Sequence, residues 1–105
     1  MTENEIKLKA IAALTALRGG FDEDLVSDLL GEVTPGQFLV PAGAPPEEVG
    51  GAVLDQLSVP LSALVSGFVA AFEVVADAYD RTGFEPSTEL VLQELALRLA
   101  SEDAD

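Results

Sequence analysis

The sequence predicts an all-α fold, a small bundle of about five helices around a central hydrophobic helix at residues 60–81. Hydrophobic residues recur at three- and four-residue steps over most of the chain, which is the period of a helix with one buried face. Glycine and proline interrupt this pattern and divide it into helix-length segments. Phe38–Val40 is the one candidate strand, and it is too short to form a sheet by itself.

The size and composition indicate a globular protein. The 105 residues suffice for one domain, expected over residues 1–100, with a solvated acidic tail at 101–105. The sequence has no Cys, His or Trp. This excludes disulfides, thiolate or imidazole metal ligands, and acid–base catalysis by imidazole. We expect no catalytic residues, no cofactor and no metal site.

The charge of the chain restricts its partners. There are 19 acidic residues against 5 Lys and Arg, which gives a net charge of -14. Such a field repels phosphates, so we expect no nucleic-acid partner and no membrane partner. The chain shows no positively charged leader, and Lys7 and Lys9 interrupt the first apolar segment. These features predict a cytoplasmic location without a secretory signal.

The first two helices follow from local signals. Thr2 and Glu5 have the spacing of a capping box, and Gly19–Gly20 ends the first helix. Asp22 is the expected N-cap of the second helix, and Gly31 is expected to close it. The first helix should bury Ile6, Ala10, Ile11, Leu14 and Leu17, and the second should bury Leu25, Val26, Leu29 and Leu30, with Phe21 packing on Val26.

Residues 34–46 form a proline-rich connection. Four prolines and two glycines prevent one long helix here. Phe38, Leu39 and Val40 are too apolar to remain in water, so this connection should pack over the core. A third helix is predicted from Pro46, with Val49, Val53 and Leu57 on its buried face. Gly50–Gly51 inside it indicates fraying or close helix packing.

A break at residues 58–60 is expected to separate this helix from the central one. The stretch from Leu57 to Phe72 carries no charge. It is shorter than the roughly 20 residues of a membrane span, and no Lys or Arg flanks it. Polar residues lie on one ridge, so the pattern favours a helix surrounded by its neighbours in water. The ridge residues are Ser62, Ser66, Glu73, Asp77 and either Asp80 or Arg81, with Val69 or Ala70 in the middle of the ridge.

The last helix is apolar on two sides. Gly83 ends the central helix, and one of Pro86, Ser87 and Thr88 should cap the next. One face of the last helix carries Leu92, Leu95, Ala96 and Leu99, and a second carries Leu90, Val91 and Leu97. This is more apolar surface than docking on one neighbour requires.

We therefore expect a non-enzymatic interaction or assembly module that self-associates through its last helix. Its partner is expected to be a protein, either a second copy of itself or a basic protein. The expected contact residues are Leu90, Val91, Leu97, Phe38 and Leu39.

An alternative is an acidic inhibitor or adaptor that docks on a basic protein. Two rows of carboxylates recur at helical steps, which places neighbouring groups roughly 6 Å apart, near the spacing of nucleic-acid phosphates. Such rows also occur on surfaces that serve solubility or salt adaptation alone. The rows are Asp24, Asp28 and Glu32, and Glu73, Asp77 and Asp80.

A second alternative is a carrier-type protein. Carrier proteins attach phosphopantetheine to the serine of an Asp-Ser-Leu motif at the start of a helix. The nearest sequence here, from Asp55 to Ser58, departs from that motif, and Ser58 is better explained as a helix cap.

Overall fold

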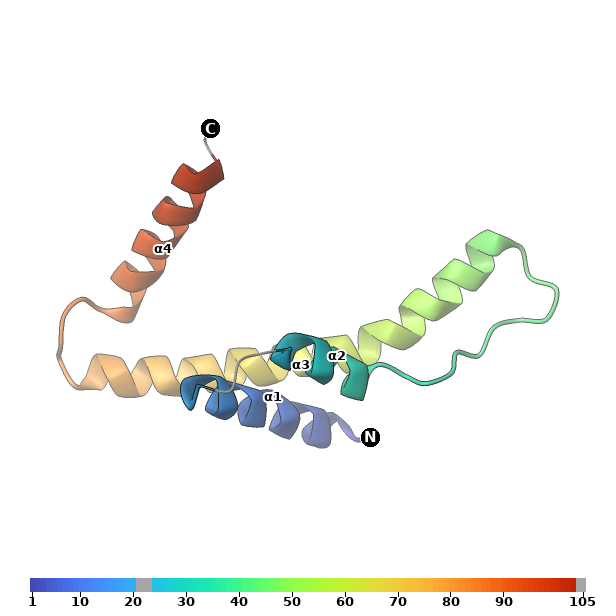
Figure 1. Cartoon of the computed structure of the whole chain (residues 1–105), viewed down its shortest axis with the longest axis horizontal. Coiled ribbons are helices and arrows are strands. Elements are labelled where there is room, and N and C mark those ends of the chain that lie inside the picture. Colours follow the sequence, from blue (N-terminus) through green and yellow to red (C-terminus); the bar gives the residue numbers. More distant parts are fainter. Residues whose placement is uncertain (21–23, 104–105) are drawn as a thin grey trace. The chain divides into compact units, whose positions relative to one another are not determined.

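The computed structural model describes residues 1–20 and 24–103, and within these ranges every regular element is a helix (Figure 1). The predicted all-α class is confirmed. The described residues form four helices, not five: α1 (Glu3–Arg18), α2 (Leu25–Val33), α3 (Pro46–Arg81) and α4 (Thr88–Asp103). The chain divides into two compact units, Met1–Ala70 (unit 1) and Ala71–Asp105 (unit 2).

The predicted break before Pro60 is wrong, because α3 continues through this residue for 36 residues. Proline in a helix removes one backbone donor and crowds the carbonyl four residues earlier, which bends a helix whose flanks both favour helix. In Figure 1 the ribbon of α3 is bent in its first half. The third and central helices of the sequence prediction are therefore one element.

The start of α1 was predicted correctly, and its buried face only in part. The Glu5 N–H donates to the Thr2 hydroxyl oxygen at 3.1 Å, as the capping spacing requires. Ile6, Ala10 and Ala13 are buried. Ile11 and Leu17, also predicted to be buried, are 44% and 48% exposed. Small alanines form most of the contact face, which lets the neighbouring helix come close.

Helices α1 and α3 come very close to each other at Gly67. A Cβ atom at Gly67 would lie 2.9 Å from the Ala10 Cβ, 3.0 Å from the Lys7 Cα and 3.2 Å from the Lys7 carbonyl oxygen. Only a residue without a side chain fits there. At Gly50 and Gly51 an added Cβ would meet no described atom within 4 Å. The close packing that we considered for the Gly50–Gly51 pair therefore occurs at Gly67 instead.

Helix α2 completes the core of unit 1. Phe21 and Asp22, predicted as staple and cap, lie outside the described residues; Asp24 occupies the N-cap position with φ 55°. The prediction that Gly31 closes this helix is wrong, because α2 continues to Val33. Pro35 disfavours a helical backbone at Thr34, which ends the helix. The buried core comprises Ile6, Ala10, Ala13, Leu29, Val33, Ala63 and Leu64, with Leu25, Leu61 and Phe68 partly buried against it.

The proline-rich connection is held to α3 by one side chain. The Leu39 N–H donates to Gln56 Oε1 at 2.8 Å, and Gln56 Nε2 donates to the Leu39 carbonyl oxygen at 2.6 Å. The same Nε2 donates to the Ala52 carbonyl oxygen at 2.9 Å. Both backbone groups of Leu39 are thus paired without a neighbouring strand.

The expected central position of the hydrophobic helix is not confirmed. Ala63, Leu64 and Gly67 are its buried residues. Val65 and Val69 are 59% and 48% exposed in unit 1. The core packs against one side of α3, so apolar residues around the rest of its circumference remain on the surface.

Candidate interaction surface

The end of α3 and the start of α4 form a hydrogen-bonded corner in unit 2. Gly83 (φ 76°) makes the turn. The Thr88 N–H donates to Asp80 Oδ1 at 2.8 Å, and the Leu90 N–H donates to the Ser87 hydroxyl oxygen at 3.3 Å. Ser87 is therefore the cap among the three predicted candidates, and Asp80 pairs a further N–H at this helix start.

Two more bonds join the corner to α3. The Tyr79 hydroxyl donates to the Pro86 carbonyl oxygen, and the Thr88 hydroxyl donates to the Ala76 carbonyl oxygen at 3.5 Å. The start of α4 is thus fixed by side chains of the last two turns of α3.

An apolar groove opens beside this corner. Its volume is about 310 Å³, and of the seven described residues that line it none carries a charge. Phe72 and Val75 on its α3 side are 47% and 67% exposed, and Val91 and Leu92 on its α4 side are 44% and 45% exposed. The full lining is Phe72, Val75, Ala76, Tyr79, Thr88, Val91 and Leu92.

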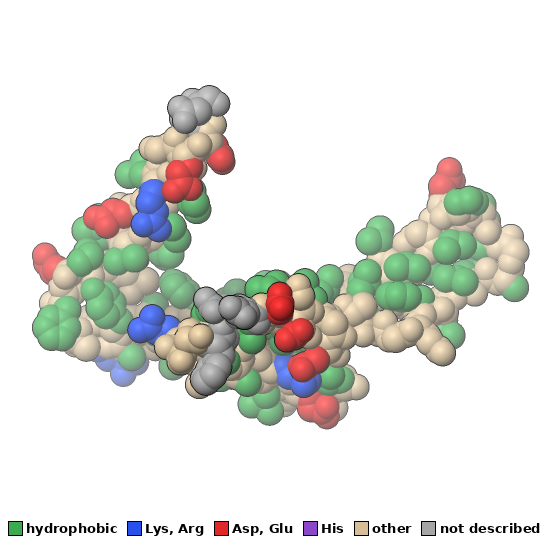
Figure 2. Space-filling model, in the orientation of Figure 1, with side chains coloured by type: hydrophobic (Ala, Val, Ile, Leu, Met, Phe, Trp, Pro, Cys, Tyr) green, Lys and Arg blue, Asp and Glu red, His purple; other side chains and the backbone are tan. Residues whose placement is uncertain are grey.

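Helix α4, all of whose residues are described, has no buried residue. Leu95, Leu97 and Leu99 are 39%, 69% and 51% exposed. Figure 2 shows hydrophobic side chains on the visible surface of α4 and on the surfaces of unit 1. A helix with large apolar residues on several sides normally lies inside an assembly of helices. The described residues of unit 2 do not provide such surroundings for α4.

Of the predicted contact residues of α4, Leu90 and Val91 line two different hollows. Val91 lines the groove with Leu92. Leu90 lines a hollow with the corner residues Phe84 and Ser87. Leu97 is more exposed than either. The structure thus separates Val91 from Leu90, which the sequence pattern placed on one face.

Phe38 and Leu39, the other predicted contact residues, lie in the connection of unit 1. Phe38 is half-buried and Leu39 is 84% exposed. The expectation that the whole segment packs over the core is therefore wrong for Leu39. Its backbone is bound to Gln56, and its side chain is presented to solvent.

The six carboxylates of the two acidic rows are exposed. Two of them have structural partners: Glu32 accepts a hydrogen bond from Lys9 Nζ at 3.0 Å, and Asp80 pairs with Thr88. The remaining residues are Asp24, Asp28, Glu73 and Asp77. The first row lies in unit 1 and the second in unit 2.

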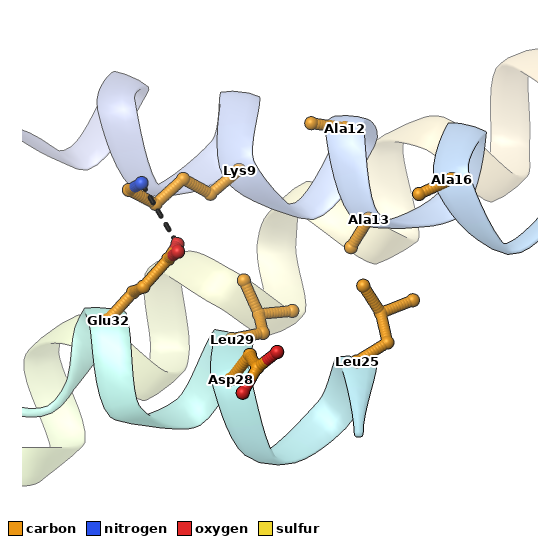
Figure 3. Close-up of a pocket in the computed structure, with 8 residues that line it drawn as sticks. All are labelled: Lys9, Ala12, Ala13, Ala16, Leu25, Asp28, Leu29 and Glu32. Carbon is orange, nitrogen blue, oxygen red and sulfur yellow. Dashed lines mark hydrogen bonds and ion pairs between the residues drawn. The ribbon is translucent and has the colours of Figure 1, made fainter. Parts of the chain in front are cut away.

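A second hollow, of about 380 Å³, lies between α1 and α2. Figure 3 shows Ala13 of α1 pointing toward Leu25 and Leu29 of α2, with the Lys9–Glu32 pair at one end. Asp28 lies on the α2 side. One ion pair and one further carboxylate provide no acid–base pair with an evident chemical task.

Neither a group of metal ligands nor the predicted cap at Ser58 is found among the residues that the structure describes. Within residues 1–20 and 24–103, no group of three Asp or Glu side chains could hold a metal ion. Ser58 lies inside α3, and its hydroxyl donates to the Asp55 carbonyl oxygen at 2.8 Å. The prediction of a helix cap at Ser58 is wrong because the helix does not restart there.

Helix α3 is long and apolar enough to cross a membrane, judged by length and composition alone. The core helix of a protein in water meets the same criterion when it is mostly buried, whereas only 17% of the apolar window of α3 is buried. In unit 1 the apolar stretch of α3 packs at Gly67 against α1, which carries Lys7 and Lys9. A bilayer around this stretch would bring these charges toward hydrocarbon, which is costly.

Exposure of the α3 residues that line the groove was not predicted from the sequence. Phe72, Val75 and Tyr79 belong to residues 60–81, which the sequence predicts to be a central helix surrounded by its neighbours. The spacing holds a signal that could have identified them: Val65, Phe68, Phe72, Val75 and Tyr79 alternate steps of three and four residues. This is the spacing of a seam between packed helices.

Comparison of the chain with protein-family models, with curated proteins and with solved structures found no match.

Proposed function

We propose that this protein is a non-enzymatic assembly module that associates with a second copy of itself through unit 2. The observation that carries the proposal is α4, which has large hydrophobic residues on several sides and no buried residue. Unit 2 spans only Ala71–Asp105. Segments below about 40 residues rarely fold alone without a disulfide, a metal or association with another chain.

The chain offers unit 2 few other means of stabilisation. The sequence contains no cysteine, so no disulfide can form. The bonds of the Asp80–Thr88 corner order the first turn of α4, and the leucines further along the helix remain exposed. Burying them against another apolar surface provides the missing stabilisation, at about 25 cal/mol for each Å² removed from water.

The test is the mass of the protein in solution over a range of concentration and salt. Light scattering after size exclusion should show a species larger than 10.9 kDa at micromolar concentration. Each copy carries a charge of -14, so screening weakens the repulsion between copies and added salt should favour association. A monomer at every salt concentration would refute the proposal.

A second candidate function is docking on a basic protein through the exposed acidic row on α3. Glu73 and Asp77 are exposed and one helical turn apart. Salt has the opposite effect here, because it screens attraction between unlike charges. This function would be favoured over self-association if the chain stays monomeric and captures basic proteins, and if this capture decreases steeply with rising salt.

Lipid binding needs an experiment of its own, because α3 has the length and composition of a membrane span. Flotation with phosphatidylcholine vesicles tests it directly. We expect the protein to remain in the dense fraction. Recovery with the vesicles would overturn association in water as the function of the exposed apolar surface.

A further inference from the structure

The groove of unit 2 is the most specific feature of this surface. Its lining is largely apolar and uncharged, and it lies beside the Asp80–Thr88 corner, with Thr88 in its lining. We infer that each copy places its α4 in the groove of the other, an inference that rests on the proposed self-association. The ends of two α3 helices and two α4 helices then form a two-fold symmetric four-helix assembly.

The spacing of the apolar residues fits this arrangement. On α4, Thr88, Leu92, Leu95 and Leu99 follow each other at steps of four, three and four residues. On α3, Phe72, Val75 and Tyr79 follow at steps of three and four. Both stripes have the repeat that packs helices side by side in bundles. Thr88 and Leu92 line the groove, so the α4 stripe begins inside it.

The α4 stripe is wide enough for two neighbours. Val91 and Ala96 lie on either side of the Leu92–Leu95 line, which broadens the apolar face well beyond a single seam. One edge of this face contacts α3 of the same chain at the groove. The other edge remains for the second copy.

The exposed area agrees with a weak, specific dimer. Six side chains, five from the two stripes together with Val91, are 39–67% exposed, while Tyr79 is half-buried. With about 60–120 Å² of apolar surface in each whole side chain, these residues offer on the order of 300 Å² per copy. An interface at the low end of the standard range buries about 600 Å² on each partner, and a little over half of that is non-polar. These side chains are Phe72, Val75, Val91, Leu92, Leu95 and Leu99.

The symmetry of the pairing limits the assembly. A contact in which the same surface is used on both copies closes on itself and gives a dimer. The groove of each copy is then filled by the other, so no unfilled groove remains to recruit a third copy. The expected product is a dimer and not a filament.

The test compares three single substitutions on α4 in the full chain. Leu92→Glu places a charge in the groove, Gln93→Glu places the same charge on a neighbouring polar position, and Leu97→Glu places it on the most exposed leucine of the helix. We expect Leu92→Glu to weaken dimerisation at least about 30-fold, as for an interface residue that carries much of the binding energy. Gln93→Glu should change the dissociation constant by less than about threefold, because an exposed charge contributes little.

The outcomes separate this inference from the proposed function. A dimer that is disrupted by Leu97→Glu and unaffected by Leu92→Glu would overturn the groove while leaving self-association intact. A trimer, a larger closed ring or a filament of the native chain would also overturn it. A native chain that is monomeric would overturn both. Far-UV circular dichroism of each variant checks that α1 to α3 are retained. A loss of helical signal larger than the contribution of α4 would show that the variant unfolds and does not merely dissociate.

Discussion

The side chain of Gln56 binds both backbone polar groups of Leu39, with its Oε1 accepting at 2.8 Å and its Nε2 donating at 2.6 Å. The amide thus occupies the place that a neighbouring strand would take, and it holds one residue of the connection in a fixed orientation. A glutamine in the first half of α3 thereby determines the position of a leucine 17 residues earlier.

We expect Gln56→Ala to release the connection. Two hydrogen bonds of about 0.5–1.5 kcal/mol each are lost. The Leu39 amide should exchange slowly with solvent deuterium in the native chain and rapidly in the variant. Gln37→Ala is the control, because Gln37 is an exposed glutamine of the same connection. Equal exchange at Leu39 in the native chain and in Gln56→Ala would contradict the contact.

Gly67→Ala should destabilise unit 1. The added Cβ would come within 3.0 Å of the Lys7 backbone, so α1 and α3 must separate, at a cost of about 1–3 kcal/mol. Gly50→Ala should instead stabilise the helix by roughly 0.5–1 kcal/mol, because the new methyl group meets open space. Urea denaturation followed by circular dichroism measures both, and effects of equal sign would refute the close approach.

Asp80→Ala should loosen the start of α4. The carboxylate accepts from the Thr88 N–H, and loss of such an acceptor at a helix start costs about 0.5–2 kcal/mol. Asp77→Ala removes the same charge from an exposed position one turn earlier and should have little effect. Hydrogen exchange of α4 amides reports the difference. If both variants weakened binding of a basic partner equally, Asp80 would act through its charge and not through this bond.

Lys9→Ala should have a small effect that depends on salt. Lys9 Nζ lies 3.0 Å from Glu32 Oε2, with both side chains substantially exposed. Exposed pairs of this kind contribute about 0.2–1 kcal/mol, and this contribution decreases as salt screens it. Denaturation at low and high salt checks the expectation. Lys7→Ala, which breaks a pair with Glu3 within α1 alone, is the matched control.

Local signals in the sequence predicted the parts of the fold that depend on neighbouring residues. The Thr2 cap, the start of α3 at Pro46 and the candidates for the α4 cap all follow from side-chain chemistry within a few positions. The continuity of α3 through Pro60 did not follow from such local signals. The preference of the flanking segments for helix outweighs the loss of one backbone donor at the proline.

The features that depend on distant residues were not predictable in this way. Nothing in the sequence around Gly67 distinguishes it from Gly50, since only the position of α1 makes the difference. The Gln56–Leu39 and Asp80–Thr88 bonds also join residues whose pairing is set by the fold. For the groove, the helical spacing was visible, but the choice between an interior and an exposed face depends on how many helices surround α3.

The absence of space at Gly67 also bears on how this sequence can diverge. Any substitution there must be accompanied by a change in α1, since the obstructing atoms include the main chain of Lys7 and no smaller side chain can relieve them. Gly50 and Gly51 are under no such restriction. Among descendants of this chain, we expect glycine to persist at position 67 while alanine, serine or larger residues accumulate at the other two.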